Sequence, residues 1–292
     1  MGDSSTDDQF LNANSIQFRY RARGSGPVFI AQGVGWGPSA AYLWNLLKPL
    51  EAHFRMIYFE PRGNGLSSRP QDQNQMTSTV MAHDLESLRK DLGLQTIPVL
   101  FGHSNGACIA LMYACLYPER VDKLILLSAQ INGGPPNDNF ARFAAKRKDD
   151  PIYGPALQAL MNAIQHPPQT DEVFAKALGG LLPYYFNDVS KVEELVEHME
   201  VDRVPPRAWA YLHQGKLDQA NPFNHMAEAG KVTAKTLLLS GRDDAICSLQ
   251  RSEELHDELR DSQLVVFDNC GHFPVVEKPV EFWGAVSEFL SI

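Results

Sequence analysis

The ten residues Ile97-Pro98-Val99-Leu100-Phe101-Gly102-His103-Ser104-Asn105-Gly106 decide the fold of this chain. Ile97 to Phe101 form an apolar run typical of a strand buried on both faces, and the Ala-rich stretch from Ala107 to Leu116 predicts a buried helix. The glycines on either side of Ser104 permit a sharp strand-to-helix turn, because they carry no Cβ that would obstruct the neighbouring backbone. A strained turn there lifts the serine hydroxyl out of the sheet. The alternative is an ordinary loop in which Ser104 caps the helix.

Strand and helix alternate on both sides of this junction. Alternation of this kind predicts an α/β fold, a mostly parallel twisted sheet with helices on both faces. It breaks after about residue 132 and resumes after 230, and the residues between carry helical patterns, many aromatics and no convincing buried strand. We therefore expect an α/β core of residues 1–132 and 231–292, interrupted by a helical cap (lid) of residues 133–230.

The expected elements follow from the apolar periodicity and from the turn residues that bound it. Strands are expected at 16–22, 28–32, 55–59, 97–101, 121–127, 236–240 and 263–267. Helices are expected at 40–50, 77–92, 107–116, 173–182, 191–199, 206–217, 249–259 and 280–290. The first dozen residues are polar, and we expect them to be frayed.

The composition narrows the class of protein. With 44% hydrophobic and 21% charged residues, the chain of 292 residues is neither collagen-like nor coiled-coil nor largely disordered. Its formal net charge of -9, from 35 acidic and 26 basic residues, argues against binding to nucleic acid or to anionic lipid.

The chain shows no membrane span and no targeting segment. No apolar stretch approaches the roughly 18 residues of a membrane span, and Met1 to Phe10 lack the layout of a signal peptide. We therefore expect a cytoplasmic protein; nothing in the chain indicates its oligomeric state.

The four cysteines show no pattern that would give them a chemical role. They have no CxxC pairing and no metal-ligand spacing with histidine. Cysteines of this kind in a cytoplasmic chain are usually reduced and buried, so we expect neither a disulfide nor a metal site. The four are Cys108, Cys115, Cys247 and Cys270.

A serine hydroxyl is a weak nucleophile until a base accepts its proton. His272 follows the last predicted strand and precedes the last helix, so we expect it on a loop at the C-terminal edge of the sheet. A carboxylate that orients this histidine is expected from Gly241-Arg242-Asp243-Asp244, which follows the strand at 236–240. Asp243 and Asp244 compete for the role, and at most one of them points inward.

Together these segments resemble the α/β-hydrolase superfamily, in particular its branch with an inserted helical cap. The chain order Ser, Asp, His is the order found in that architecture. The resemblance runs from about Ile16 to the C-terminus and is weak across the cap. The matching segments are Gln32-Gly33-Val34-Gly35-Trp36, Glu60-Pro61-Arg62-Gly63-Asn64-Gly65-Leu66-Ser67, Gly102 to Gly106, Gly241 to Asp244 and Gly271-His272-Phe273-Pro274.

The resemblance implies a catalytic triad. Ser104 would be the nucleophile and His272 the base. The family's acid usually falls three residues after the glycine of the acid loop, which selects Asp244 and leaves Asp243 as the fallback. No metal and no organic cofactor is implied, because the triad chemistry is complete without one.

The resemblance also implies an oxyanion hole made of two backbone N–H groups. One belongs to the residue after the nucleophile, here Asn105, and the other comes from the loop after an early strand, here Val34. That loop usually reads His-Gly in the family, and this chain has Gln32 in place of the histidine. The hole can survive the change because its donor is a backbone group, but Gln32 could alter the local hydrogen bonding.

The cap is rich in aromatic residues, which suits an apolar or aromatic small-molecule substrate. The expected pocket residues are Trp36, Tyr184, Tyr185 and Trp209, and the alternative for each is packing within the protein. Epoxide hydrolases and haloalkane dehalogenases of this fold attack with an aspartate, so Ser104 argues against both. Tyr184 and Tyr185 could otherwise be taken for a pair that activates an epoxide.

Three functions remain open from the sequence. The first is a serine hydrolase acting on a small apolar or aromatic ester, lactone or activated ketone, with C–C bond cleavage in a diketone as a variant. The second is an aminopeptidase that resembles proline iminopeptidases, favoured by Arg62-Gly63-x-Gly-x-Ser and the acidic run from Glu193 to Asp202 but lacking their usual His-Gly-Gly-Pro-Gly segment. The third is a ligand-binding protein or a cyclase that reuses the fold without hydrolysis.

Overall fold

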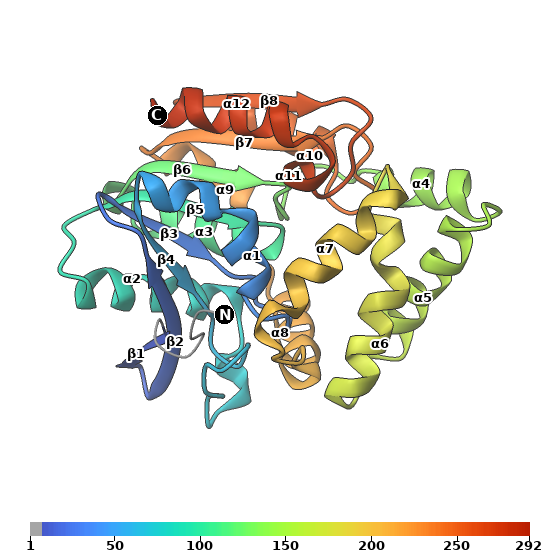
Figure 1. Cartoon of the computed structure of the whole chain (residues 1–292), viewed down its shortest axis with the longest axis horizontal. Helices are drawn as coiled ribbons and strands as arrows, with labels where there is room; N and C mark the ends of the chain where they lie inside the picture. Colours follow the sequence, from blue (N-terminus) through green and yellow to red (C-terminus); the bar gives the residue numbers. More distant parts are fainter. Residues whose placement is uncertain (1–7) are drawn as a thin grey trace.

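A computed structural model describes residues 8–292 of the chain. Within this range eight strands form one mixed sheet in the order β1-β2-β4-β3-β5-β6-β7-β8 (Figure 1). β1 pairs with β2 and β2 with β4 in antiparallel fashion, and all the other neighbours are parallel. The strands are β1 (Asp8–Ala13), β2 (Ile16–Arg23), β3 (Val28–Gln32), β4 (Arg55–Phe59), β5 (Ile97–His103), β6 (Val121–Leu127), β7 (Lys235–Gly241) and β8 (Ser262–Phe267).

Helices cover both faces of the sheet, as the alternation of strand and helix predicts. Side chains of a strand alternate between the two faces. In β5, Leu100 therefore packs with one hydrophobic cluster, while Val99 and Phe101 pack with the other. The first cluster contains α2 (Ser78–Asp91), α3 (Asn105–Leu116) and α10 (Leu249–Glu258), and the second contains α1 (Ala41–Leu46), α11 (Pro274–Glu277) and α12 (Pro279–Leu290).

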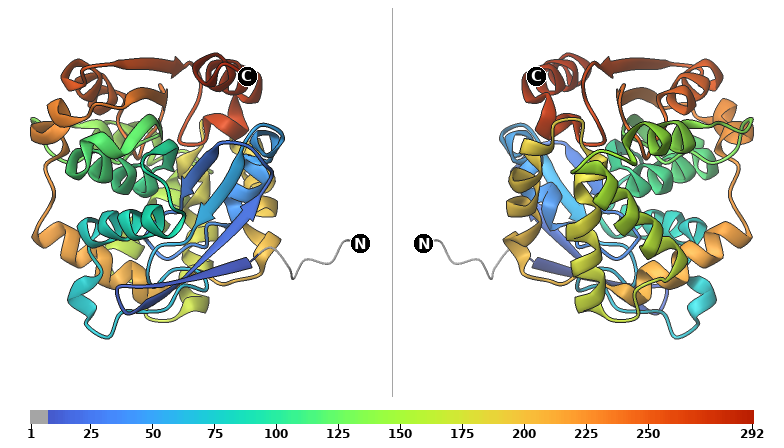
Figure 2. Two further views of the ribbon diagram at one scale, coloured as in Figure 1. Left: turned by 90° about the vertical axis from the view of Figure 1, so that its left-hand side faces the viewer. Right: turned by 90° about the vertical axis from the view of Figure 1, so that its right-hand side faces the viewer.

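The chain between β6 and β7 is helical in the described residues, as expected. The helices α5 to α8 lie beyond the C-terminal ends of the parallel strands (Figure 1), where α6 packs against α5 and α8. The side views show α7 on the other side of the molecule from α8, next to α1 (Figure 2). The short α9 instead packs against α3 and α10. The helices are α4 (Asn139–Arg147), α5 (Tyr153–Gln165), α6 (Asp171–Leu181), α7 (Val192–Met199), α8 (Ala208–Ala220) and α9 (His225–Glu228). No helix of residues 8–292 combines the length and apolar character needed to cross a membrane.

Short 3₁₀ helices link these elements. One of them, Lys48–Ala52, takes the second half of the helix expected at 40–50, where Pro49 stands in the first turn. The others are Gln73–Gln75, Pro118–Arg120, Leu182–Tyr185, Val189–Lys191, Glu200–Asp202 and Ala229–Lys231.

The expectation of a frayed N-terminus is wrong for residues 8–13, which form the edge strand β1; residues 1–7 lie outside the described range. Ion pairs hold this polar strand, because the Asp8 carboxylate contacts the guanidinium groups of both Arg19 and Arg21 on β2.

The apolar periodicity of the sequence did not predict the helices α4 and α5. The second of these begins at Tyr153-Gly154-Pro155, where glycine and proline obscure the helical pattern.

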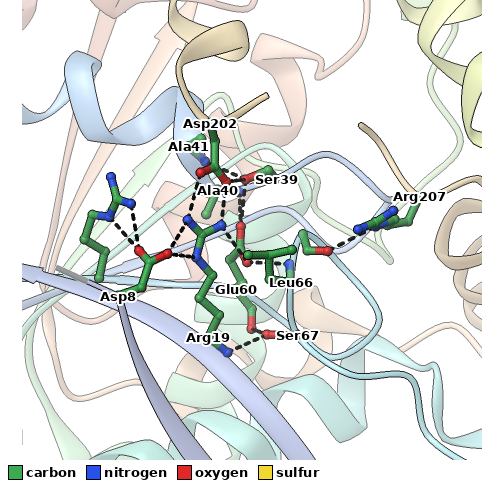
Figure 3. A network of polar contacts seen from close by, with 12 residues as sticks. Asp8, Arg19, Ser39, Ala40, Ala41, Glu60, Leu66, Ser67, Asp202 and Arg207 are labelled. Atoms are coloured by element: carbon green, nitrogen blue, oxygen red, sulfur yellow. Dashed lines mark hydrogen bonds and ion pairs between the residues drawn. The ribbon is translucent and has the colours of Figure 1, made fainter. Parts of the chain in front are cut away.

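A buried ionic network ties the end of the cap to the edge of the sheet (Figure 3). Arg19 is 1% exposed and contacts three carboxylates, those of Asp8, Glu60 and Asp202. Asp202 ends the cap's Glu200–Asp202 turn, and Glu60 follows β4. Burial raises the pKa of Glu60, while Arg19 and the Ser39 hydroxyl oppose that rise. Each buried charge therefore has a partner, as charges in a protein interior require.

A second buried ion pair fixes the loop that follows β4. The guanidinium of Arg62 donates two hydrogen bonds of 2.6 Å to the carboxylate of Asp84 on α2. Both side chains are almost fully buried, at 1% and 0% exposure. Removing one member of such a pair leaves the other charge buried without compensation.

Replacing Asp84 by alanine is expected to lower the free energy of unfolding by about 3–5 kcal/mol, because Arg62 then loses its only carboxylate among the described residues. The matched control is Asp91→Ala, on the exposed end of the same helix, which should change stability by about 0.5 kcal/mol or less. Urea unfolding followed by circular dichroism measures both. Equal stability of the two variants would show that the pair does not hold the loop.

Candidate active site

The parallel strands bring the predicted site residues to one edge of the sheet. Gln32 at the end of β3 lies opposite Gly102 near the end of β5, and Gly102 in turn lies opposite Leu126 of β6. At the other end of the parallel ladder, Gly241 of β7 lies opposite Phe267 of β8. The loops that leave these strands therefore begin at the same edge, which is where an open α/β sheet usually binds its ligands.

Ser104 occupies the junction between β5 and α3 in a strained conformation. Its backbone angles are φ 55° and ψ -119°, and a residue with a Cβ rarely adopts a positive φ. The Ser104 carbonyl accepts hydrogen bonds from the N–H groups of Ala107, Cys108 and Gln130, which fix the turn. Its side chain forms no helix-capping hydrogen bond, so the alternative of a simple Ser cap does not describe this loop.

The two glycines flanking Ser104 are required by close packing. A Cβ on Gly102 would lie 2.4 Å from the Gly106 carbonyl oxygen, and a Cβ on Gly106 would lie 2.6 Å from the Gln32 carbonyl oxygen. Either contact is far shorter than real Cβ atoms allow. The glycines therefore let α3 begin against both β5 and the end of β3, which places Ser104 beside the loop that follows Gln32.

His272 and Asp244 form a buried pair. His272 Nδ1 lies 2.8 Å from Asp244 Oδ2, and each side chain is 1% exposed. The other Asp244 oxygen, Oδ1, accepts from the N–H groups of Ile246 and Cys247 at 2.8 and 2.9 Å. Asp243 is half-exposed, and its N–H donates to the Cys270 carbonyl. Of the two aspartates left open by the sequence, Asp244 is the one that contacts the histidine.

This pairing leaves the second ring nitrogen of His272 available. A carboxylate only accepts hydrogen bonds, so Nδ1 carries the proton and Nε2 carries the lone pair. Nε2 is buried and has no hydrogen-bond partner among the described residues, and the Ser104 hydroxyl is not bonded to it here. Catalytic hydrogen bonds of free enzymes are often long and tighten only when substrate binds.

Cys247 lies beside this pair. Ligand atoms of Asp244, Cys247 and His272 all lie within 4.8 Å of one another, and among residues 8–292 this is the set that could hold a metal ion. Burial and the negative charge of Asp244 raise the pKa of the Cys247 thiol well above its ordinary value, so the thiol stays neutral. Both Asp244 oxygens already accept hydrogen bonds, which accounts for the cluster by interactions within the protein. All four cysteines are free, as expected.

The histidine inside the motif, His103, supports the backbone of His272. Its Nε2 donates to the His272 carbonyl oxygen at 3.1 Å, and its Nδ1 accepts from the Tyr42 hydroxyl at the same distance. Complete burial lowers the pKa of His103 well below its usual value, so the ring is neutral. The sequence alone did not predict a role for His103, and only its position directly before Ser104 could have suggested one.

The cap contacts the His272 loop directly. The His272 N–H donates to the Tyr185 carbonyl oxygen at 2.7 Å, and the Tyr185 ring stands edge-on to the His272 ring, with centroids 5.1 Å apart. Glu277 strengthens this junction. Its carboxylate accepts from the N–H of Gly271 at 2.8 Å and from those of Asn187 and Asp188 at 2.9 and 2.8 Å. The sequence offered no signal for Glu277.

The two backbone groups expected in the oxyanion hole have no acceptor within residues 8–292. Neither the N–H of Val34 nor that of Asn105 forms a hydrogen bond, whereas the neighbouring Gly33 N–H donates to the Phe59 carbonyl oxygen at 2.9 Å. Gln32, which replaces the family's histidine, is fully buried and donates through Nε2 to the Gly33 carbonyl oxygen at 2.8 Å. Gln32 therefore forms its hydrogen bond within its own loop. The N–H groups of Val34 and Asn105 stay without an acceptor among the described residues.

The expected pocket residues lie in different places. Tyr185 contacts His272, and Trp36 stands edge-on to Tyr211 of α8 with ring centroids 6.2 Å apart. Tyr184 is instead fully buried in a hydrophobic cluster that joins cap residues to Ala245, the residue after Asp244. Trp209 stacks on His213 at 4.4 Å, with the Arg69 guanidinium 5.0 Å from its ring centre. Tyr184 and Trp209 thus have packing partners of their own, and neither ring packs against His272.

Comparison with known proteins agrees with this architecture. The model of the alpha/beta hydrolase fold family matches residues 27–279. A 2-hydroxy-6-oxo-6-(2'-aminophenyl)hexa-2,4-dienoic acid hydrolase of Metapseudomonas resinovorans is 23% identical over 97% of this chain and 91% of its own length. A proline iminopeptidase of Lactobacillus crispatus is 29% identical, over 88% of this chain and 87% of its own.

A solved structure gives the same result for the fold. An alpha/beta fold family hydrolase from Bacillus anthracis superposes with a TM-score of 0.76 at 18% identity, covering 96% of this chain and 98% of the other. The family match spans most of the chain, from the third strand to the last helix. The chain therefore belongs to the α/β-hydrolase family.

Proposed function

We propose that this chain is a serine hydrolase that cleaves a small, uncharged ester, lactone or activated ketone with an apolar or aromatic body. The observation that carries the proposal is the buried His272–Asp244 hydrogen bond of 2.8 Å, which leaves Nε2 without a partner. It lies at the same sheet edge as the strained turn at Ser104. We also propose that residues 133–230 act as the cap that covers the substrate.

Each residue of the site has a role in this mechanism. The Ser104 hydroxyl attacks the carbonyl carbon while His272 Nε2 takes its proton. The negative charge that develops on the carbonyl oxygen is met by the N–H groups of Val34 and Asn105. His272 then passes the proton to the leaving group, and Asp244 stabilises the imidazolium in between. In the second half of the reaction His272 takes a proton from water, and the water oxygen attacks the acyl carbon. Ser104 then leaves and receives the proton from His272.

The charges of the cap argue against a substrate with a free amino terminus. Recognition of an ammonium group needs an unpaired carboxylate in the pocket. Asp202 is already paired with Arg19, and Glu277 accepts three backbone hydrogen bonds. The other acidic residues of the α7 region lie on the exposed surface: Glu193, Glu194, Glu197 and Glu200. The engaged carboxylates of Asp202 and Glu277 therefore favour a substrate without a free amino terminus.

The cap's basic residues argue in the same way against an anionic substrate. The relative from Metapseudomonas resinovorans is named for a carboxylic acid substrate. In this chain, buried Arg147 donates to the Tyr184 carbonyl and lies against the rings of Phe143 and Tyr153. Arg207 is bonded to Asp171 and to the Gly65 carbonyl. With both guanidinium groups engaged, an uncharged ester fits better than a dienoic acid cleaved at a C–C bond.

Replacing Ser104 by alanine should abolish both labelling by a fluorophosphonate probe and turnover of p-nitrophenyl butyrate, since the attacking oxygen is gone. The matched control, Ser287→Ala on α12, should label and turn over like the wild type. Fluorescent gel scanning and release of p-nitrophenol are the measurements. Wild-type protein that is folded yet unlabelled would refute the hydrolase proposal and favour a ligand-binding or cyclase role.

Asp244→Asn should lower kcat by about 10³–10⁴-fold with little change in KM, because the histidine loses the group that fixes its tautomer. Asp243→Asn, one residue earlier and half-exposed, should keep kcat within about twofold. Steady-state kinetics on p-nitrophenyl butyrate compare the two. If Asp243→Asn were the damaging substitution, the assignment of the triad acid would be wrong.

Charge on the substrate should lower kcat/KM by about tenfold or more, because Arg147, Arg207 and Glu277 already have partners within the protein and would not compensate its desolvation. The comparison uses p-nitrophenyl butyrate, the anionic p-nitrophenyl hemisuccinate and the cationic proline p-nitroanilide. The neutral ester should be the best substrate. Preference for the proline anilide would instead establish the aminopeptidase.

A further inference from the structure

A buried polar cluster connects the cap to the segments that carry the proposed oxyanion-hole donors. At its centre is Gln214 on α8, the cap helix that packs against α6, and its side chain is 0% exposed. Its Nε2 group donates to Ser78 Oγ at 2.9 Å and to Asn105 Oδ1 at 3.1 Å, and Asp218 Oδ2 lies at 3.3 Å. One amide of the cap thus joins two helices of the core.

Asn105 is the point where this cluster meets the oxyanion hole. Its Oδ1 accepts from the Gly35 N–H at 2.9 Å, and its Nδ2 donates to Gln130 Oε1 at 3.0 Å. Gly35 directly follows Val34, and Asn105 itself supplies the second proposed donor. The Asn105 side chain therefore fixes the two donor segments relative to each other, and Gln214 holds the oxygen through which it does so.

Asp218 anchors α8 to the core one helical turn after Gln214. Its two carboxylate oxygens accept from the N–H and the hydroxyl of Ser78, at 2.9 and 2.6 Å. Ser78 is the first residue of α2, so its N–H has no partner within its own helix. Hydrogen bonds at both Gln214 and Ser78 therefore set the position of α8 over the loop at residues 33–35.

The contact between Gln214 and the loop is very close. A Cβ on Gly35 would lie 2.4 Å from Gln214 Oε1, so a side chain at this position would displace the Gln214 amide. Gln214 Oε1 is itself buried without a hydrogen-bond partner among the described residues. Buried unpartnered carbonyl oxygens are uncommon and call for an explanation beyond stability. Here the explanation is that the amide is oriented by its donor end, which has three acceptors.

We infer that Gln214 is a positioning residue for the oxyanion hole. It holds Asn105 and the loop at residues 33–35 so that the N–H groups of Val34 and Asn105 converge on the reacting oxygen. This inference rests on the proposed hydrolase function and makes the cap a part of the catalytic geometry. Donors placed for the oxyanion stabilise the transition state more than the bound substrate, so their displacement lowers kcat more than it weakens binding.

The test replaces Gln214 by methionine, which keeps the length of the side chain and removes the donor. Turnover of p-nitrophenyl butyrate should show kcat lowered by about 10–100-fold, less than the 10²–10³-fold that loss of a whole donor causes. KM should stay within about twofold. Affinity for a trifluoromethyl ketone, which forms an oxyanion adduct with the serine, should fall by the same factor as kcat/KM. Gln219→Met, exposed on the same helix, is the matched control and should behave as wild type.

Hydrogen exchange gives a readout that does not depend on activity. Peptides spanning residues 33–37 should exchange faster in Gln214→Met than in wild type or Gln219→Met, because Asn105 Oδ1, which accepts from the Gly35 N–H, is no longer held by Gln214. A wild type without esterase activity would defeat the proposed function, and exchange would still decide whether Gln214 orders the loop. If Gln214→Met does not fold, Gln214→Asn withdraws the amide from Asn105 while keeping the site polar, with the same expectations.

Three results would overturn the inference. One is a folded Gln214 variant whose kcat, inhibitor affinity and loop exchange all match the wild type. Another is an effect confined to KM, which would make Gln214 a substrate contact. Lower thermal stability with unchanged kinetics would likewise assign Gln214 a structural role only.

Discussion

The strained backbone at Ser104 is the constraint on which the rest of the site depends. A positive φ at a residue with a Cβ costs about 1–3 kcal/mol and persists only where the surroundings enforce it. Three N–H groups hold the Ser104 carbonyl, and two flanking glycines let α3 start against the end of β3. The same packing places Asn105 beside Gly35, so the turn that exposes the hydroxyl also brings together the two proposed donor segments.

The cap is attached to the core through the parts that do the proposed chemistry. Tyr185 accepts from the His272 N–H, Gln214 donates to Asn105, and Asp202 pairs with buried Arg19 near the edge of the sheet. All three contacts are polar and shielded from water, so each is directional and costly to break. Small shifts of the cap therefore act on the base and on the oxyanion loop as well as on the substrate pocket.

Much of this architecture follows from local rules that a single sequence displays. The buried run of β5, the glycines around Ser104 and the two strand-end loops at Asp244 and His272 are each visible as composition and spacing. Polar edge strands are harder to predict, because β1 buries only Leu11 in the core and is held otherwise by its ladder with β2 and by the ion pairs of Asp8.

The supporting residues could not be predicted for a related reason. His103 contacts a residue 169 positions away, Gln214 one 109 positions away and Glu277 one 90 positions away, and no local pattern marks such partners. The residue pattern alone left Asp243 and Asp244 open and the family spacing favoured Asp244, which is the one that bonds to His272 in the folded loop. The aromatic content of the cap was the weakest guide to the pocket residues. Tyr184 and Trp209 contribute to that content but pack against residues other than His272.

A crystal structure of the wild-type protein after reaction with a fluorophosphonate would test the central claim most directly. The account predicts phosphorus bonded to Ser104 Oγ, with the phosphoryl oxygen about 2.7–3.1 Å from the N–H groups of both Val34 and Asn105. His272 Nε2 should face the adduct while its Nδ1 stays bonded to Asp244. An adduct on another residue, or a phosphoryl oxygen directed away from these two N–H groups, would contradict it.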